Sequence, residues 1–220
     1  MISEAVAFLR EELSRYIVTN QKDAGSTTNI KLRPEDIMLG NIATLDNDQE
    51  GKLKNKVIVT LVNIEEESTL KNGKLYYKNP LSNGIEYLQT PVYLNLYLLF
   101  CATLPDSGGA PSDNYERALE RLGLVIQFFQ AKKSFTIQNS PLSSFASTED
   151  RQNLEVLRLL PELYTLTFEQ INHLWGSLGG KQVPFAMYKV RLVQVGESIG
   201  REAPVIEEIQ RNDEYLSKSE

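Results

Sequence analysis

The sequence predicts a mixed α/β fold, built as a single domain in which a mostly antiparallel sheet is flanked by helices. The chain has 220 residues, which is enough for one sizeable hydrophobic core. Hydrophobic residues make up 41% of the chain and charged residues 24%, which is the balance of an ordinary globular protein. Stretches with helical periodicity and stretches of strand character follow one another in the order α-β-β-β-α-β-β-α-β. This order favours helices packed on a mixed sheet.

The first part of the chain is expected to contain a helix followed by two strands. Apolar residues recur at every third or fourth position from Ile2 to Ile17, so residues 3–18 predict an amphipathic helix that Ser3 can cap. Residues 34–43 alternate like a strand, and we expect this strand to pair with the next one as a hairpin.

The strand that organises the rest of the chain is expected over residues 53–65. Val57 to Ile64 form a nearly unbroken apolar, β-branched run, which indicates a strand buried on both faces or at a tight interface. The longest predicted strand covers residues 87–102, and both of its faces are largely apolar. Such a strand needs cover on both sides, from helices or from a neighbouring subunit.

Two helices and three strands are expected in the second half of the chain, and the first of these strands is a short one over residues 135–137. The clearest helix covers residues 114–131, and a further helix is capped by Thr167 and ends near residue 178, before two glycines. A strand is expected over residues 154–160, with a helix as the alternative, and a final strand over residues 183–195. The apolar stripe of the clearest helix consists of Tyr115, Leu119, Leu122 and Ile126.

Two polar segments are expected to serve in interactions. Residues 69–85 form an exposed excursion between tight-turn dipeptides, and Tyr76 and Tyr77 lie at its middle. Aromatic residues of this kind are enriched at the cores of interfaces. Residues 196–220 form a polar tail, distinct from a domain of residues 1–195, which we expect to be ordered only on partners. The apolar patch of this tail consists of Val205, Ile206 and Ile209.

Composition and charge exclude several classes of partner. The net charge of −6 and the pI near 5.1 argue against a nucleic-acid-binding surface, which needs clustered Lys and Arg. No apolar run approaches the ~18–20 residues that span a bilayer, and no signal peptide is recognisable. The single cysteine excludes an intrachain disulfide and fits a reducing compartment. We therefore expect a protein made in the cytoplasm that contacts neither nucleic acid nor membrane directly.

The sequence predicts no catalytic, cofactor-binding or metal-binding residue, and so no enzyme. His173 is the only histidine, which argues against His-based metal sites and Ser-His-Asp catalysis. Cys101 lies in an apolar strand, where a small buried side chain is the favoured interpretation. Glu65 and Glu67 share one side of their strand. They are either a metal or acid-base pair or, as we favour, a rim that enters solvent or pairs with a partner's Lys or Arg.

Two further motifs fail on spacing. The acidic loop at residues 46–50 lacks the twelve-residue spacing and terminal Glu of an EF-hand, so it predicts a solvated turn. Leu178–Lys181 contains two glycines and a lysine, but these residues end a helix, whereas a phosphate-binding loop opens one.

Four groups of segments, spread along the chain in the same order, resemble one known family. They are Val59–Glu67 with Leu70–Asn72, Pro91–Phe100, Tyr115–Leu119 with Ile126–Gln130, and Leu174–Gly180 leading into Pro184 and Tyr188–Arg191. Through these segments the chain is similar over most of its length to the tail-terminator, or cap, proteins of bacterial extracellular contractile injection systems of the Photorhabdus virulence cassette and antifeeding prophage type. The loops at residues 20–29 and 139–150 carry none of this resemblance.

The resemblance implies a structural protein with a phage tail-terminator-like fold. Similar proteins form a hexameric ring at the end opposite the baseplate, where they stop the growth of the inner tube and the sheath. It therefore implies a homohexamer that contacts the inner tube protein and the sheath protein, needs no cofactor, and passes from the bacterial cytoplasm into the assembled injection particle. The candidate interface residues are Glu65, Glu67, Tyr76, Tyr77, Val205, Ile206 and Ile209.

Two other functions remain open from the sequence. The terminator of an ordinary phage tail would contact a head-completion protein instead of ending an exposed particle. A small-molecule-binding or enzymatic α/β domain would show a ligand-dependent shift in melting temperature without forming a ring or binding a tube.

Overall fold

The computed structural model divides the chain into two compact units. The larger unit contains residues 1–68 and 92–195, and the smaller unit contains residues 69–91 and 196–220. The residues that the structure describes are 2–20, 32–48, 50–70, 76–78, 85–87, 92–104, 110–140, 157–179, 181–195 and 201–203.

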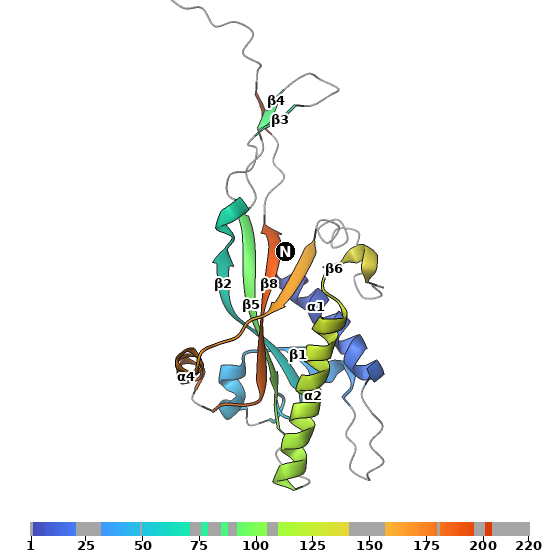
Figure 1. The fold of residues 1–220 in the computed structure, drawn as a ribbon, viewed down its shortest axis with the longest axis vertical. Helices are drawn as coiled ribbons and strands as arrows, with labels where there is room; N and C mark the ends of the chain where they lie inside the picture. The colour runs from blue at the N-terminus through green and yellow to red at the C-terminus, as the bar shows by residue number, and fades with distance from the viewer. Residues whose placement is uncertain are drawn as a thin grey trace, which may run out of the picture. The chain divides into compact units, whose positions relative to one another are not determined.

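The larger unit is built on a six-stranded sheet with the strand order β1-β2-β5-β8-β7-β6 (Figure 1). Every neighbouring pair is antiparallel except β1 and β2, which run parallel. The predicted mixed, mostly antiparallel sheet is thus confirmed. The strands are β1 (Ile37–Leu39), β2 (Val57–Glu66), β5 (Val92–Ala102), β6 (Phe135–Thr136), β7 (Arg158–Leu163) and β8 (Phe185–Val195).

The predicted hairpin between the first two strands is wrong, because β1 lies parallel to β2. The hydroxyl of Thr60 donates to the carbonyl of Gly40 at 2.7 Å and accepts the N–H of Ile42 at 3.2 Å. These two bonds fix the point at which the chain leaves the sheet after β1. The chain then runs through the 3₁₀ helix η2 (Ile42–Asn47) and enters β2 in the direction of β1, which a tight hairpin does not allow.

Helices flank the sheet at the predicted places. α4 begins with the expected cap, because Thr167 Oγ1 accepts the N–H of Gln170 at 3.3 Å and Gln170 Oε1 accepts the N–H of Thr167 at 2.9 Å. The helices are α1 (Ile2–Asn20), α2 (Pro111–Ala131) and α4 (Phe168–Ser177), and the other short 3₁₀ turns are η1 (Pro34–Asp36), η3 (Ser68–Leu70) and η4 (Ile137–Asn139).

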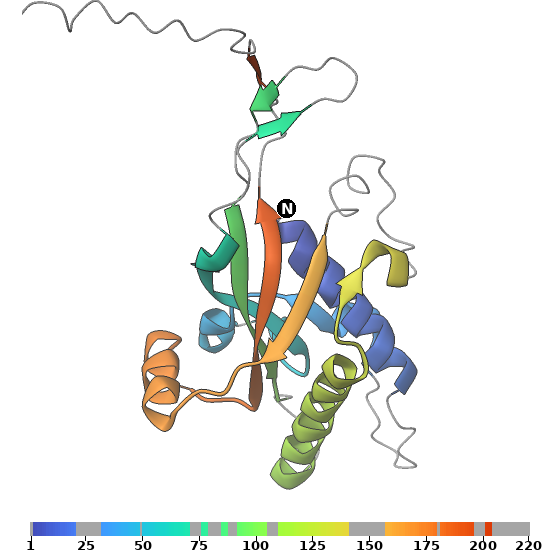
Figure 2. The same ribbon diagram turned by 45° about the horizontal axis from the view of Figure 1, so that its top comes forward.

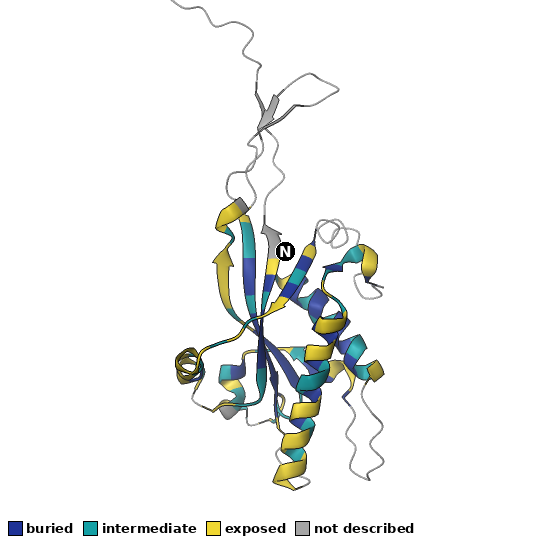
Figure 3. Cartoon of the chain, in the orientation of Figure 1, coloured by how far each residue is buried: buried dark blue, intermediate teal, exposed yellow. Residues whose placement is uncertain are grey.

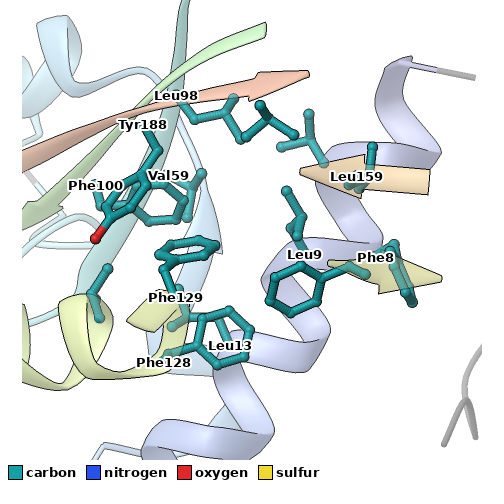
Figure 4. Close-up of a cluster of buried hydrophobic side chains, with 14 of the residues drawn as sticks. Phe8, Leu9, Leu13, Val59, Leu98, Phe100, Phe128, Phe129, Leu159 and Tyr188 are labelled. Atoms are coloured by element: carbon teal, nitrogen blue, oxygen red, sulfur yellow. The ribbon is translucent and has the colours of Figure 1, made fainter. Parts of the chain in front are cut away.

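The main hydrophobic core lies between one face of the sheet and the helices α1 and α2 (Figure 4). Aromatic rings hold its centre, with the centroids of Phe100 and Phe129 5.1 Å apart and those of Phe129 and Tyr188 4.3 Å apart. Pairs at these distances add to the free energy gained by burying the rings. The residues labelled in Figure 4 are Phe8, Leu9 and Leu13 of α1, Phe128 and Phe129 of α2, and Val59, Leu98, Phe100, Leu159 and Tyr188 of the sheet.

A second core covers part of the opposite face, under α4 and η2. Since successive strand residues point to opposite faces, β5 serves both cores: Leu98 and Phe100 enter the main core, and Leu99 and Cys101 enter the second. Figure 1 shows α2 and α4 on opposite sides of the sheet. The expected cover on both faces is therefore confirmed for the C-terminal half of β5. The buried members of the second core are Ile42, Leu53, Ile58, Leu99, Cys101, Trp175 and Met187.

Three of the four residues of the predicted apolar stripe of α2 lie on the outer surface of that helix, whereas the fourth, Leu122, packs against the main core. Tyr115, Leu119 and Ile126 are 50%, 46% and 40% exposed. The helix instead buries the face that carries Phe128 and Phe129. Two adjacent phenylalanines remove more apolar area from water than the stripe does, so they set the rotation of the helix.

The smaller unit contains a three-stranded sheet with the order β3-β4-β9. Both strand pairs are antiparallel, and Ile85 lies opposite Ala203. A segment beyond residue 195 therefore shares a sheet with the excursion that precedes β5, a pairing that the sequence analysis did not anticipate. The strands are β3 (Tyr76–Lys78), β4 (Ile85–Tyr87) and β9 (Arg201–Ala203).

The cores lead to a prediction for stability. Leu98 is 0% exposed, and its truncation leaves a cavity, so we expect Leu98→Ala to lower the free energy of unfolding by about 2–5 kcal/mol. The control Leu119→Ala changes a residue that is 46% exposed and is expected to cost less than about 1 kcal/mol. Chemical denaturation of both variants at one protein concentration measures the difference. Equal losses would contradict the assignment of these residues to core and surface.

Candidate functional site

The N-terminal half of β5 and its neighbours present a polar surface on the face that α4 and η2 cover elsewhere. β2 changes from buried to exposed after Thr60 (Figure 3). This finding corrects the expectation that the whole face is apolar. We name the surface the polar face; its residues, from β2, β5, β7 and β8 and the position directly after β2, are Asn63, Glu65, Glu67, Asn95, Tyr97, Glu162, Lys189 and Arg191.

The register of the sheet aligns these side chains. Asn63 lies opposite Tyr97, Tyr97 opposite Lys189, and Lys189 opposite Glu162. Directly opposite residues of antiparallel strands share a face and lie close enough for their side chains to interact. One polar row therefore crosses the four strands β2, β5, β8 and β7, which Figure 2 shows side by side.

Glu65 is held by two neighbours in this surface. The hydroxyl of Tyr97 donates to Glu65 Oε2 at 2.6 Å, and Lys189 Nζ donates to the same oxygen at 3.0 Å. The hydrogen bond from Tyr97, followed by that from Lys189, lowers the pKa of Glu65 below its ordinary value. The pKa of Lys189 is raised, chiefly by its bond to Glu65, and that of Tyr97 is raised, chiefly by burial. The three groups form a fixed ion pair with a bound phenol.

Further polar contacts continue the surface on both sides. Arg191 and Glu162 form an ion pair at 2.8 Å, and Asn95 Nδ2 donates to Glu67 Oε2 at 3.0 Å. The Arg191–Glu162 pair is exposed and contributes little to stability on its own, whereas Asn95 is buried beneath this surface. Together these contacts give the polar face a hydrophilic surface of mixed charge.

The predicted interface residues fall in separate parts of the structure. Glu65 and Glu67 lie on the polar face, where they bond to Tyr97, Lys189 and Asn95 of the same chain. Tyr76 and Tyr77 lie in β3 of the smaller unit. Val205, Ile206 and Ile209 lie outside the described residues.

Sequence reasoning missed six members of the polar face: Asn63, Asn95, Tyr97, Glu162, Lys189 and Arg191. Tyr97 belongs to a strand face that also carries a tyrosine and an asparagine, and this polar alternation was the available signal. The lysine and the arginine alternate in the same way along β8. Their pairing with acidic residues on β2 and β7 depends on long-range strand order, which the sequence alone does not reveal.

The arrangement offers no nucleophile or metal ligand set among the described residues. Burial raises the pKa of the Cys101 thiol to about 12, so it stays protonated and inert at neutral pH. His173 is exposed on α4, 3.9 Å from Glu169 one turn earlier. Across the described ranges, no three His, Cys, Asp or Glu side chains are grouped so that they could hold a metal ion. No helix in these ranges is long and apolar enough to cross a membrane.

A groove of about 1050 Å³ lies along the outer edge of β2. Its back wall is β2 from Val59 to Val62, and its other sides come from the start of α1, the end of β1 and the end of α4. We name it the β2 groove. Its apolar lining includes Ile2, Val6, Leu39, Leu61, Leu174 and Leu178.

The fold and these surfaces define a class of small α/β structural module with open sheet edges. The family model described as Pvc16 N-terminal domain matches residues 4–208. The chain belongs to the Pvc16 N-terminal domain family, which confirms the family resemblance found in the sequence. No curated protein matches.

Two solved structures share the fold. One is the sheath/tube terminator of an extracellular contractile injection system, PVC, in the extended state, with 13% identity and a TM-score of 0.53, covering 100% of this chain and 65% of that one. The other is the tube-terminating cap of the anti-feeding prophage, with 15% identity and a TM-score of 0.55, covering 96% of this chain and 61% of that one. The chain thus spans less than two thirds of the length of either protein. The predicted terminator-like fold is confirmed.

The geometry of the polar face predicts a titration result. Tyr97→Phe removes the larger cause of the lowered Glu65 pKa, so we expect that pKa to rise toward its ordinary value. A lowered carboxyl pKa stabilises the fold above the pKa of the unfolded chain, and this contribution is lost as the pH falls through the folded pKa. NMR titration of the Glu65 carboxyl measures the shift, with Tyr93→Phe in the same strand as the control. An unchanged titration in Tyr97→Phe would refute the assigned cause.

Proposed function

We propose that this protein is the structural cap of a contractile, phage-tail-like injection particle and ends the polymerisation of its tube and sheath. The observation that carries the proposal is the family match over residues 4–208. The likeness of the fold to a sheath/tube terminator and to a tube-terminating cap supports it. No observation on the described residues favours an enzyme, because the carboxylate of Glu65, whose pKa is lowered, is held in an ion pair with Lys189.

In this proposal six copies form a ring that contacts the inner tube on one side and the outermost sheath subunits on another. A ring subunit needs two different surfaces for its two neighbours, because the contacts are head-to-tail. The open sheet edges of the larger unit are suitable surfaces. Since every contact is repeated around the ring, modest contacts of each copy become strong together.

The proposed mechanism is mechanical. The cap holds tube and sheath together at the end far from the baseplate, so that sheath contraction is transmitted to the tube. The ring is assembled in the bacterial cytoplasm and stays with the particle. Tyr76 and Tyr77 of β3 are proposed contacts with a neighbouring copy or with the tube, since aromatic residues are enriched at the cores of interfaces.

The tail is proposed to bind sheath subunits. Its first part, β9, pairs with β4 within the smaller unit. The apolar patch of Val205, Ile206 and Ile209 follows β9, and a segment of this kind binds a partner by adding a strand or by packing in a groove.

The capping role is tested by co-expression with candidate tube and sheath proteins, followed by negative-stain electron microscopy. We expect tubes of defined length that carry a six-fold cap at one end, and uncapped tubes of variable length when this protein is omitted. Absence of this protein from tube and sheath would refute the proposal. A melting shift with a small ligand, without tube binding, would favour the ligand-binding alternative.

The tail is tested by truncation after Ala203, which keeps β9 in place. We expect the truncated protein to cap tubes but to lose most of its co-purification with sheath, because Val205, Ile206 and Ile209 are removed. The triple substitution of these residues by Ser in the full-length chain is the matched variant and should reproduce the loss. Sheath binding that survives both changes would assign the sheath contact to another surface.

A further inference from the structure

The sheet of the larger unit has two edges that are only partly covered. β1 pairs with β2 at Val57–Val59 alone, and no described strand pairs with the rest of that edge. At the opposite side β6 pairs with β7 at Arg158–Leu159 alone, which leaves the edge at residues 160–163 without a described partner. Such unpaired stretches are templates for pairing with another chain.

The two open stretches lie at the same height in the sheet. Leu61 of β2 is connected across β5 and β8 to Leu163 of β7, through the opposite pairs Leu61–Leu98, Leu98–Tyr188 and Tyr188–Leu163. Two steps further along the strands, Ile64 is connected to Pro161 in the same way, through Leu96 and Val190. The polar row from Asn63 to Glu162 lies between these two rows.

Two backbone hydrogen bonds show which residues of β2 point their N–H and C=O groups away from β5, toward the open edge. The N–H of Gly40, just after β1, donates to the carbonyl of Val59 at 3.1 Å, so the backbone N–H and C=O groups of Val59 point away from β5. The backbone groups of Leu61, two residues later in the strand, point the same way. The N–H of Glu67 donates to the carbonyl of Tyr93 at 2.8 Å, so the backbone groups of Glu67 point toward β5. Because this direction alternates along the strand, the backbone groups of Ile64, three residues earlier, point away from β5.

The outward-pointing residues of β7 lie level with those of β2. The N–H of Tyr164 donates to the carbonyl of Met187 at 2.8 Å, so the backbone groups of Pro161 and Leu163 point away from β8. The level pairs Leu61 with Leu163 and Ile64 with Pro161 are therefore pairs in which both residues point their backbone groups toward the open edge. Proline lacks an N–H and is tolerated on an edge strand where that position faces outward.

The side chains at the two edges also match. Leu61, Ile64 and Leu163 are 38%, 44% and 58% exposed. They lie opposite members of the main core and therefore on the α1 side of the sheet. Leu61 also lines the β2 groove, together with Ile2 and Val6 at the start of α1.

We propose that the outer edge of β2 at residues 61–64 pairs with the edge of β7 at residues 160–163 of a second copy of this chain. The proposal deepens the proposed ring and rests on it. Strand directions alternate from β2 through β5 and β8 to β7. A neighbour rotated about an axis along the strands therefore brings its β7 antiparallel to β2, and the alternation continues from copy to copy.

The equal height of the two edges decides the kind of assembly. A head-to-tail contact between edges at different heights produces a rise at every step and an open helix, whereas edges at equal height close into a ring. In this contact Leu61 exchanges two backbone hydrogen bonds with Leu163 of the next copy. The N–H of Ile64 donates to Pro161 of the next copy, and the exposed leucines cover each other beside the β2 groove.

The proposed contact also determines which way the polar face points in the ring. A closed sheet has less room on its inner side, and the helices α1 and α2 occupy the other side over the main core. The helices α1 and α2 therefore lie outside, whereas α4, which covers the other end of the sheet face that carries the polar face, lies on the channel side. The polar face with Glu65, Lys189 and Arg191 lines the central channel, where water keeps its mixed charges solvated. Asn63 lies next to Glu162 of the following copy and continues the polar row around the ring.

Cysteine cross-linking tests this contact. In the full-length chain, Asn63→Cys and Glu162→Cys lie between the two outward-facing pairs, where opposite Cα atoms are ~4.5 Å apart, a distance that a disulfide spans. We expect the double variant to form a ladder of covalent oligomers upon mild oxidation. A mixture of the two single variants should form cross-linked dimers and nothing larger. Each single variant alone should form none, which also controls for the buried Cys101.

The outcomes separate this contact from the proposed function. If the double variant caps tubes but forms no ladder, the strand pairing is wrong and the capping role stands. If it forms a ladder but never binds tubes, the pairing stands and the capping role falls. Dimers from Asn63→Cys alone would indicate a two-fold contact between β2 edges and would overturn the head-to-tail pairing.

A surface substitution in the double-cysteine background provides the second test. Leu163→Asp places a charge against the leucine of the neighbouring β2, so we expect the yield of cross-linked oligomers to fall tenfold or more. Leu119→Asp changes a comparably exposed leucine on the outer face of α2 and should leave the yield unchanged. Circular dichroism verifies that both variants are folded. Equal yields from the two variants would contradict the proposed contact.

Discussion

The larger unit depends on the division of β5 into two halves with different surroundings. In its C-terminal half, Leu98 and Phe100 enter one core and Leu99 and Cys101 enter the other, and each of these side chains is at most 1% exposed. In its N-terminal half, Leu94 and Leu96 still face the main core, but Asn95 and Tyr97 face a polar surface. The unit is therefore three layers thick at one end and two at the other. Only the two-layered end leaves strand edges and a sheet face for other chains.

Local features of the sequence determine where that end begins. The hydroxyl of Thr60 bonds to Gly40 and Ile42 and so ends β1 after three residues. At the other side, Pro161 cannot donate an outward hydrogen bond, which protects the β7 edge from indiscriminate pairing. A partner for this edge must bring its own donors to the remaining carbonyls and tolerate one missing N–H. Polar residues that end a strand or blunt an edge thus make the molecule selective in what it binds, while the hydrophobic cores keep the two edges at a fixed height.

The sequence predicted the elements well and their connections poorly, for a physical reason. The helical period of α1, the cap of α4 at Thr167 and the strand character of β2 are local patterns, and the structure confirms them, although β2 is buried only up to Thr60. The parallel position of β1, the pairing of β9 with β4 and the outward rotation of α2 depend on contacts between distant residues, which one sequence does not display. Glu65 was correctly placed at a strand end, but its partners Tyr97 and Lys189 are separated from it by 32 and 124 residues. The family resemblance carried the function because no local motif encodes it.

In the proposed ring, strand edges suit a cap that transmits an axial load. Strands in such a ring run along the particle axis, so a pull from sheath or tube acts along covalent backbone. Hydrogen bonds between strands lie perpendicular to the strands and hence follow the circumference. They resist widening of the ring and share an axial load in parallel, because sliding one copy past the next breaks every bond of the joint at once. A joint made only of side chains could slip by small steps, whereas a strand joint slips by two residues or not at all, because a one-residue slip places apolar side chains on the polar face. The alternation of Leu61, Asn63 and Ile64 against Leu163, Glu162 and Pro161 is thus the feature that would hold neighbouring copies level.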